Sequence, residues 1–263
     1  MSDDITQASM RAVEQCCPLV ELRRYTLKPG RRDELIALFE EHFIEGQEKY
    51  GMRIIGLFRD LNRPDQFVWL RGFADMESRR RALEGFYYGP IWQAHRAAAN
   101  DTMIDSDNVL LFRPAHPASS FHVDPSSRPA LDAPETTGGF MLATLYAFAA
   151  PVASEFVTLF TQEMAPVLQA AGAHILGQFI TESSENTFPA LPVREGEYFF
   201  IWLASFADEA AYHAYRSALA SDPTWRTSLA PALRDRTIGP EEVLELQPTR
   251  RSLLRHRRSD PNE

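Results

Sequence analysis

The stretch GMRIIGLF, which begins at Gly51, aligns with GAHILGQF, which begins at Gly172, and this internal match decides the fold. Both glycines and the final phenylalanine recur at an offset of 121 residues. Two aromatic pairs share that offset: Tyr25 with Tyr146 and Phe39 with Phe160. Further along, FVWLRGFAD from Phe67 aligns with FIWLASFAD from Phe200 at an offset of 133. Colinear matches with a single change of offset indicate a duplicated unit.

The rise in offset from 121 to 133 corresponds to a 12-residue insertion in the second copy, within residues 181–197. This segment is rich in Ser, Glu, Pro and Gly, which is typical of a loop. We therefore expect the second copy to carry a longer hairpin connection than the first, where residues 60–65 form the corresponding turn.

Each copy has the pattern strand, helix, strand, strand, helix, strand. In the first copy the expected strands are 19–27, 53–59, 66–73 and 109–113, and the expected helices are 31–43 and 76–100, the latter interrupted near Gly89. This order is that of the ferredoxin-like βαββαβ module. The sequence therefore predicts an α+β fold class with two tandem ferredoxin-like modules.

From Pro114 to Gly138 the sequence has no periodicity and contains five prolines. Such a segment predicts an extended linker, and the arginine-rich C-terminus predicts a solvated, disordered tail, with a contact to an acidic partner as the alternative. The predicted divisions are an N-terminal segment (1–17), a first module (18–114), a proline-rich linker (115–138), a second module (139–248) and a basic C-terminal tail (249–263).

Composition excludes several classes of protein. The formal net charge of −9 argues against a nucleic-acid or anionic-membrane binder. No apolar run approaches the roughly 20 residues that span a bilayer, and the polar N-terminus lacks the features of a signal peptide. These observations predict a cytoplasmic protein. Cys16 and Cys17 are the only cysteines and are adjacent, so we expect two reduced thiols.

Three motifs carry a resemblance to a known family. VELRRYTLKPGR (20–31) resembles the opening strand of the NIPSNAP family, and FVWLRGF (67–73) and FYYGPIW (86–92) resemble two of its later motifs. The resemblance is good over residues 18–114 and weaker over 139–248. It implies a dimeric α/β-barrel fold, in which two modules pack sheet against sheet around a cavity. A tandem chain would then be a pseudo-dimer, with a homodimer as the alternative.

Strand alternation selects candidate site residues. Glu21, Arg23 and Tyr25 share one face of the first strand, which in the implied fold faces the barrel, while Val20 and Leu22 face the helices. In the second copy Leu142, Thr144 and Tyr146 stand at the three positions, so the charges occur in one copy only. The candidate catalytic residues are Glu21, Arg23, Tyr25, His42 and His95, and the candidate ligand-binding residues are Arg53, Trp69, Arg71 and Trp92.

A structural interpretation stands beside each functional one. A glutamate–arginine pair can be a scaffold element lost from a redundant copy, recurring tryptophans are often core residues, and lone histidines are more often structural than catalytic. If burial raises the pKa of Glu21, that carboxylate could act as a general base. Tyr25 could donate a hydrogen bond to a carbonyl or phenolate oxygen.

No residue spacing indicates a metal site or a nucleotide-binding loop. The superfamily includes small monooxygenases, haem-degrading enzymes and isomerases, so the resemblance implies no single reaction and leaves the cofactor unassigned. The leading hypothesis is an enzyme acting on a small, largely apolar or aromatic molecule: a cofactor-independent or haem-linked monooxygenase, or an isomerase. The alternative is a non-catalytic module that binds a small ligand or a protein.

Overall fold

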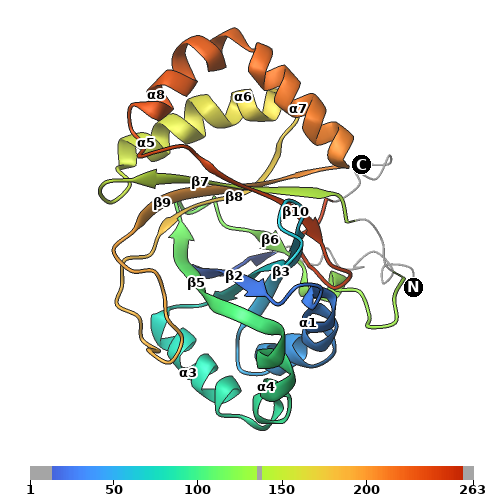
Figure 1. The fold of residues 1–263 in the computed structure, drawn as a ribbon. Helices are drawn as coiled ribbons and strands as arrows, with labels where there is room; N and C mark the ends of the chain where they lie inside the picture. The colour runs from blue at the N-terminus through green and yellow to red at the C-terminus, as the bar shows by residue number, and fades with distance from the viewer. Residues whose placement is uncertain (1–13, 135–137, 257–263) are drawn as a thin grey trace, which may run out of the picture.

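The computed structural model describes residues 14–134 and 138–256, and it shows a mixed α+β fold built around a closed antiparallel barrel (Figure 1). The barrel strands are β2 (Leu19–Leu27), β3 (Arg53–Asp60), β4 (Gln66–Phe73), β5 (Met103–Pro114), β7 (Phe140–Phe148), β8 (His174–Thr181), β9 (Tyr198–Phe206) and β10 (Glu242–Pro248). The helices are α1 (Arg32–Leu38), α2 (Ile44–Glu48), α3 (Met76–Tyr87), α4 (Pro90–Thr102), α5 (Ser154–Leu159), α6 (Ala165–Ala170), α7 (Glu209–Ser221) and α8 (Ala230–Arg234). Short elements complete the chain: β1 (Glu14–Gln15), β6 (His122–Val123), a 3₁₀ turn (Pro125–Ser127) and π-helical turns (Phe39–Phe43, Phe160–Met164 and Trp225–Leu229).

The barrel is closed by one chain. Strands follow one another in the order β10-β3-β4-β2-β5-β8-β9-β7, and β7 pairs with β10. The first half of the chain supplies β3-β4-β2-β5 and the second supplies β8-β9-β7-β10. The halves meet at two seams, where β10 pairs with β3 and β5 pairs with β8. Among the described residues the barrel sheet has no open edge, which removes the exposed backbone groups of an edge strand.

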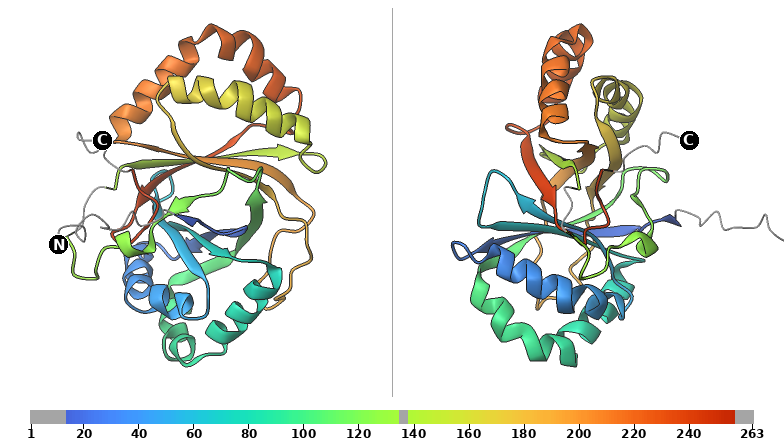
Figure 2. Two further views of the ribbon diagram at one scale, coloured as in Figure 1. Left: turned by 180° about the vertical axis from the view of Figure 1, so that it is seen from behind. Right: turned by 90° about the vertical axis from the view of Figure 1, so that its right-hand side faces the viewer.

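Helices cover the outside of the barrel on two opposite sides. Helices α1 to α4 cover the sheet of the first half, and α5 to α8 cover that of the second (Figures 1 and 2). The aligned residues occupy equivalent places, since the π-helical turns Phe39–Phe43 and Phe160–Met164 are again 121 residues apart. In the described part of the chain no helix is both long and apolar enough to cross a bilayer.

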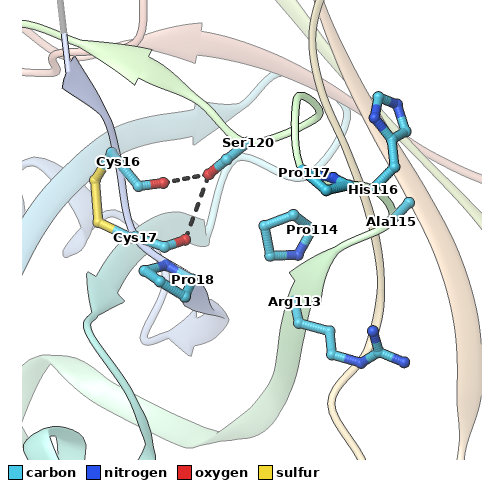
Figure 3. Close-up of a pocket in the computed structure, with 9 residues that line it drawn as sticks. All are labelled: Cys16, Cys17, Pro18, Arg113, Pro114, Ala115, His116, Pro117 and Ser120. Atoms are coloured by element: carbon cyan, nitrogen blue, oxygen red, sulfur yellow. Dashed lines mark hydrogen bonds between the residues drawn. A yellow bond between two sulfur atoms is a disulfide. The ribbon is translucent and has the colours of Figure 1, made fainter.

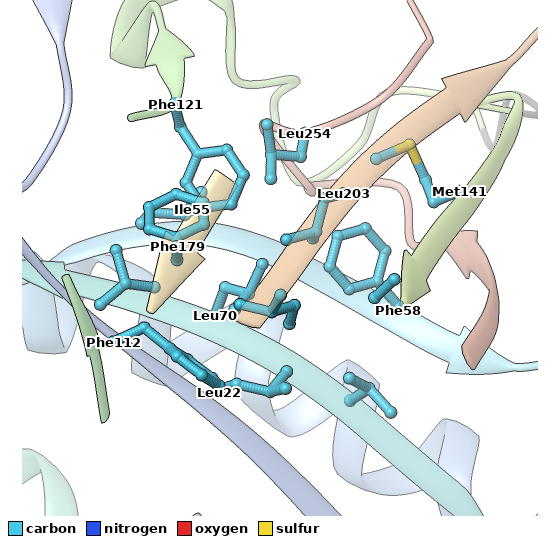
Figure 4. Packing of buried hydrophobic residues seen from close by; sticks show 14 of the residues in the cluster. Leu22, Ile55, Phe58, Leu70, Phe112, Phe121, Met141, Phe179, Leu203 and Leu254 are labelled. Atoms are coloured by element: carbon cyan, nitrogen blue, oxygen red, sulfur yellow. The ribbon is translucent and has the colours of Figure 1, made fainter. Parts of the chain in front are cut away.

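The barrel interior is a packed apolar core. Figure 4 shows phenylalanines from both halves, among them Phe58, Phe112 and Phe179, meeting between the two sheets. Val20 and Leu22 belong to this cluster, whereas Tyr25 and Trp69 pack with residues of the first helices. The predicted orientation of β2 is therefore wrong. Each strand is covered on both faces, by the opposite sheet and by helices, so alternation alone does not distinguish the two sides.

Two aligned glycines recur because an aromatic ring lies over each of them. A Cβ at Gly56 would lie 2.4 Å from Cζ of Phe58, and one at Gly177 would lie 2.6 Å from Cε2 of Phe179. Both rings belong to the barrel core. The glycines therefore make room for the rings that fill the interior.

We expect Gly56→Ala to lower the free energy of unfolding by about 1–3 kcal/mol, because the added methyl group displaces a core ring. Urea denaturation measures the change. Combining it with Phe58→Leu should give less than the sum of the two single losses, since the smaller side chain removes the clash. Strictly additive losses would show that the ring and the glycine do not interact.

Both ends of the first module differ from expectation. Cys16 and Cys17 are joined by a disulfide, so the predicted pair of reduced thiols is wrong. The linker is attached to the first half at two places. Its strand β6 pairs with β1, and Nη2 of Arg128 lies 2.7 Å from Oε1 of Glu48. Segment 1–13 and residues 135–137 lie outside the described residues.

The C-terminal segment up to residue 256 is not a solvated tail. Arg251 donates to the backbone oxygen of Glu40 at 2.6 Å and to the carboxylate of Glu45. Ser252 is fully buried, and its hydroxyl oxygen accepts from the amide of Leu57 at 3.1 Å. Carboxylates on the first helical region thus bind the basic segment, and residues 257–263 lie outside the described residues.

Candidate functional site

Neighbouring strands bring the predicted polar residues together. In the antiparallel register Glu21 on β2 lies opposite Arg71 on β4, and Arg23 lies opposite Trp69. Residues opposite each other on one face have Cβ atoms about 4.5–5.5 Å apart. Since Val20 and Leu22 point into the barrel, these side chains point outward and are covered by the helices of the first half.

Glu21 is fully buried and binds three arginines. Its Oε2 accepts from Nε of Arg71 at 2.5 Å and from Nη1 of Arg23 at 3.2 Å. Its Oε1 accepts from Nε of Arg79 at 2.5 Å. All four side chains are at most 1% exposed, so this is an ion cluster inside the protein.

Neutral groups take part of the remaining hydrogen-bonding capacity of the arginines. Nη1 of Arg71 donates to Oε1 of Gln47 at 2.9 Å, and Nη1 of Arg79 donates to Oδ1 of Asn186 at 2.9 Å. Nε of Arg23 donates to the hydroxyl oxygen of Tyr25 at 3.2 Å. These contacts fix the three guanidinium groups in place.

The electrostatics of the cluster exclude the predicted role of Glu21 as a base. Burial by itself would raise the pKa of this carboxyl group, but Arg71, Arg79 and Arg23 together hold it well below its usual range. A general base at neutral pH needs a pKa near 7. The expectation of a raised pKa is therefore wrong, and Glu21 is an anchor for the arginines.

Tyr25 keeps its proton and can donate it in a hydrogen bond. Burial raises the pKa of Tyr25 to about 12, even though Arg23 opposes this shift. The bond from Arg23 uses an oxygen lone pair and leaves the O–H proton available. Because the ring lines a cavity, Tyr25 is placed to donate to an oxygen atom of a bound molecule.

The cavity lies between the sheet and the helices of the first half. It has a volume of about 20 Å³, which is room for about one water molecule. Its lining residues are Tyr25, Leu35, Phe39, Phe43, Gln47, Trp69, Phe86, Tyr87, Trp92 and Met103. An aromatic ligand therefore requires the covering side chains to move outward. Tyr87 at the end of α3, Trp92 on α4 and Met103 after it are only partly buried, so such a movement would displace these residues first.

Haem does not fit this cavity in the conformation that the structure shows, because a pocket for a drug-sized ligand has a volume of about 300–1,000 Å³. We assign it no role in the mechanism. In the described ranges no group of three or more His, Cys, Asp or Glu side chains is arranged to hold a metal ion.

The remaining predicted residues are dispersed. His42 and His95 stack on each other, with ring centroids 3.8 Å apart, and His95 lies 6.3 Å from the ring of Phe43. Neither histidine lines the cavity. Arg53 is partly exposed and lines a different cavity at the surface. Its Nη1 lies 3.5 Å from Oε1 of Glu48. The structure thus brings together Glu21, Arg23, Tyr25, Trp69, Arg71 and Trp92, and leaves out His42, His95 and Arg53.

Sequence reasoning missed Arg79. It lies on α3 with Ala82, Leu83 and Phe86, all buried. These residues are three, four and seven positions apart, which is the spacing of one helical face. A charged residue on that apolar face was the signal that could have identified Arg79.

A loop of the second half covers the site of the first half. The β8–β9 connection, which contains the insertion, extends to α3 (Figure 1). There Asn186 binds Arg79, and the hydroxyl of Thr187 donates to the backbone oxygen of Met76 at 3.0 Å. Phe188 is 4% exposed, and its ring stacks 6.1 Å from that of Tyr87. Only the length of the insertion could have hinted at this role.

The equivalent place in the second half has no charged cluster. Leu142, Thr144, Leu168, Ala204 and Tyr212 stand where the first half has Glu21, Arg23, Gln47, Arg71 and Arg79. Nε1 of Trp202 donates to the hydroxyl of Tyr146 at 3.2 Å. In the first half the corresponding Nε1 of Trp69 has no acceptor among the described residues, because Tyr25 is bound to Arg23 instead. The two halves therefore differ in chemistry.

A larger groove lies elsewhere, at the surface beside the disulfide. It has a volume of about 510 Å³ and is lined by Cys16, Cys17, Pro18, Arg113, Pro114, Ala115, His116, Pro117 and Ser120 (Figure 3). Ser120 donates to the backbone oxygen of Cys16 and holds the disulfide against the linker. The groove is open and has no buried ion cluster, so the smaller sheet–helix cavity remains the candidate site.

Comparison with known families finds one match, and it covers the half of the chain that contains this cavity. The NIPSNAP family model matches residues 20–117. This segment is a NIPSNAP domain. It runs from β2 to the end of β5 and includes every residue of the ion cluster on the sheet and on α3. Within the NIPSNAP domain the charged residues of the opening strand therefore lie beneath its own helices.

Solved structures show the same barrel over nearly the whole chain. An anthrone oxidase-like protein aligns with 90% of this chain and 95% of its own, with a TM-score of 0.54 and 13% identity. A candidate monooxygenase from Lactobacillus acidophilus aligns with 89% of this chain and 97% of its own, with a TM-score of 0.51 and 13% identity. At such identities the likeness shows the fold alone.

A NIPSNAP-like domain protein from Burkholderia xenovorans has 29% identity over 35% of this chain and 81% of its own, with a TM-score of 0.33. No curated protein matches the chain in sequence.

Proposed function

We propose that the NIPSNAP domain binds a small, largely apolar or aromatic molecule between its sheet and its helices, and transforms it by oxygenase- or isomerase-like chemistry. One observation carries the proposal: aromatic walls and a hydroxyl donor surround a cavity that adjoins a fixed, buried cluster of guanidinium groups. Apolar walls with a few oriented polar groups are the usual composition of a small-molecule site.

The chain's own residues would divide the work between orientation and charge stabilisation. Trp69, Phe86 and Trp92 would hold an aromatic ring, and Tyr25 would donate to a carbonyl or phenol oxygen at its edge. Both oxidation and isomerisation of such a compound develop negative charge on that oxygen. Fixed donors in a buried site stabilise developing charge without having to reorganise.

A non-catalytic ligand-binding function is the second candidate, and a specific observation favours it. Glu21 is the carboxylate of the site, and three arginines occupy it. Among the cavity-lining residues Tyr25, Gln47, Trp69, Tyr87 and Trp92 carry polar side-chain atoms. None of these groups is a strong base at neutral pH. A proton leaving the bound molecule would therefore have to go to solvent.

We also propose that the chain consists of two ferredoxin-like modules, residues 18–114 and 139–248, that act as a pseudo-dimer. The shared element order, the two seams and the equivalent π-helical turns support this proposal. Association into a homodimer is the alternative arrangement, and size-exclusion chromatography with light scattering distinguishes one chain from two.

The test uses matched tyrosines. Purified protein is incubated in air with two-ring phenols such as 1-naphthol, while oxygen uptake and product mass are followed. We expect Tyr25→Phe to lower turnover about 100- to 1,000-fold, the usual range when a hydrogen bond made in the transition state is lost, and Tyr146→Phe to leave it unchanged. Ligand-induced thermal stabilisation without turnover would support the binding function instead. Equal behaviour of the two variants in both assays would place the site elsewhere.

A further inference from the structure

The ion cluster of the NIPSNAP domain contains more positive than negative charge. Arg23, Arg71 and Arg79 are each buried, and Glu21 is the only carboxylate that pairs with them in the described part of the chain. Burial lowers the pKa of Arg79, against the attraction of Glu21, because an incompletely neutralised cation is costly inside a protein. Two positive charges are thus left without a counter-ion.

The same arginines have unused donors. Arg71 and Arg79 each use Nε for Glu21 and Nη1 for a neutral amide oxygen. Nη2 of each is buried and has no acceptor among residues 14–134 and 138–256. Nε and Nη2 form the fork with which a guanidinium group binds a carboxylate through two parallel hydrogen bonds. Both forks are therefore half used.

Arg71 contacts two residues that line the cavity. The guanidinium carbon of Arg71 lies 5.1 Å from the ring centroid of Trp69, which lines the cavity. Gln47, which holds Nη1 of Arg71, is also a lining residue. Nε1 of Trp69 is a third buried donor without an acceptor in the described residues. Its counterpart Trp202, in the half without arginines, is bound to Tyr146.

We propose that the molecule bound by the NIPSNAP domain carries a carboxylate, which binds beside Glu21 at the free donors of Arg71 and Arg79. The inference rests on the proposed function, since it specifies the ligand of the same cavity. A carboxylate has one oxygen for the free Nη2 of each arginine, and it supplies negative charge to a cluster that lacks it. The ligand class is thus an aromatic or largely apolar carboxylic acid.

The experiment compares 1-naphthoate with its neutral counterpart 1-naphthamide by calorimetry on the full chain, with inorganic phosphate as a third probe. We expect naphthoate to bind at least 10-fold more tightly than naphthamide, and phosphate to bind far more weakly because it has no apolar body. Arg71→Gln should reduce the preference for naphthoate to less than threefold. Arg81→Gln, which changes an exposed arginine on the same helix as Arg79, should leave it unchanged.

The outcomes separate the two proposals. Equal affinity for naphthoate and naphthamide would overturn the carboxylate inference while leaving the proposed cavity in use. Binding of neither probe would remove the support of both. If Arg71→Gln does not fold, Trp69→Phe removes a free donor with less disturbance, and Trp202→Phe is its matched control. Undiminished naphthoate binding by Trp69→Phe would then place the carboxylate away from this cluster and overturn the inference.

Discussion

Replacing Glu21 by glutamine is expected to lower the free energy of unfolding by about 3–5 kcal/mol, the usual loss when one partner of a buried ion pair is removed. The carboxylate is fully buried and is bound by three arginines. Without it, three like charges remain together in the protein interior. Guanidinium chloride denaturation followed by circular dichroism measures the loss.

The matched control and the rescue both come from this chain. Glu77→Gln removes an exposed carboxylate that pairs with Arg80, and we expect a much smaller loss than for Glu21→Gln, because exposed ion pairs contribute little to stability. Replacing the whole cluster with the residues of the second half should restore most of the stability, because no buried charge then remains: Glu21→Leu, Arg23→Thr, Arg71→Ala and Arg79→Tyr. A loss for Glu21→Gln no larger than that for Glu77→Gln would contradict the account.

The pH dependence of stability follows from the same carboxylate. The pKa of Glu21 is lowered on folding, so the unfolded chain takes up the proton first as the pH falls. The contribution of ionised Glu21 to the free energy of unfolding is complete above the ordinary glutamate pKa and is lost progressively below it. The wild type should therefore lose more stability than Glu21→Gln between neutral pH and pH 3. If the stabilities of the two proteins fall in parallel as the pH is lowered, this prediction is wrong.

Phe58→Ala is expected to destabilise both halves of the molecule together, by about 3–5 kcal/mol. Phe58 is fully buried in the barrel core, which contains residues of all eight barrel strands. Since neither sheet covers its inner face without the other, a cavity there weakens the whole barrel rather than one half.

Hydrogen exchange resolved by segment tests this prediction. The slowest amides of β4, in the first half, and of β9, in the second, should lose equal protection in Phe58→Ala. Leu61→Ala, which changes an exposed residue in the nearby hairpin, should alter neither. Loss of protection in β4 alone would mean that the first half unfolds independently of the second.

The sequence was sufficient to predict a mixed α+β fold, because its recurring residues are ones that pack. Aromatic residues and glycines such as Phe58 and Gly56 recur at a fixed offset, and the structure shows why each needs the other. The break between α3 and α4 followed from Gly89 and Pro90, since proline favours the first turn of a helix. Neighbouring residues along the chain decide such turns and close packing contacts, so the sequence is enough to predict them.

The location of the site was only half predictable. Glu21, Arg23 and Arg71 were identified because they occur in one copy, but Glu21 and Arg23 were assigned to the wrong side of the sheet. Eight of the nine residues of β2 are buried, so both of its faces read as interior. Only the closed barrel, with apolar side chains filling its inside, shows that the charges lie beneath the helices.

Contacts between distant segments could not be predicted at all. Arg251 looked like part of a basic tail, because nothing local indicates that Glu40 and Glu45 will accept its hydrogen bonds. Asn186 lies in a loop whose sequence is typical of a surface connection. Each gains its partner only through the three-dimensional arrangement of the two halves.

The β8–β9 loop that reaches Arg79 has a consequence for how such a protein can diverge. In an assembly of two identical chains, every inserted residue appears twice by symmetry, so a segment that encloses one site must enclose the other as well. Joining both copies in one polypeptide ends that constraint. Two unlike halves in one chain have no such symmetry, so one half can supply an enclosure for a site that only the other half contains.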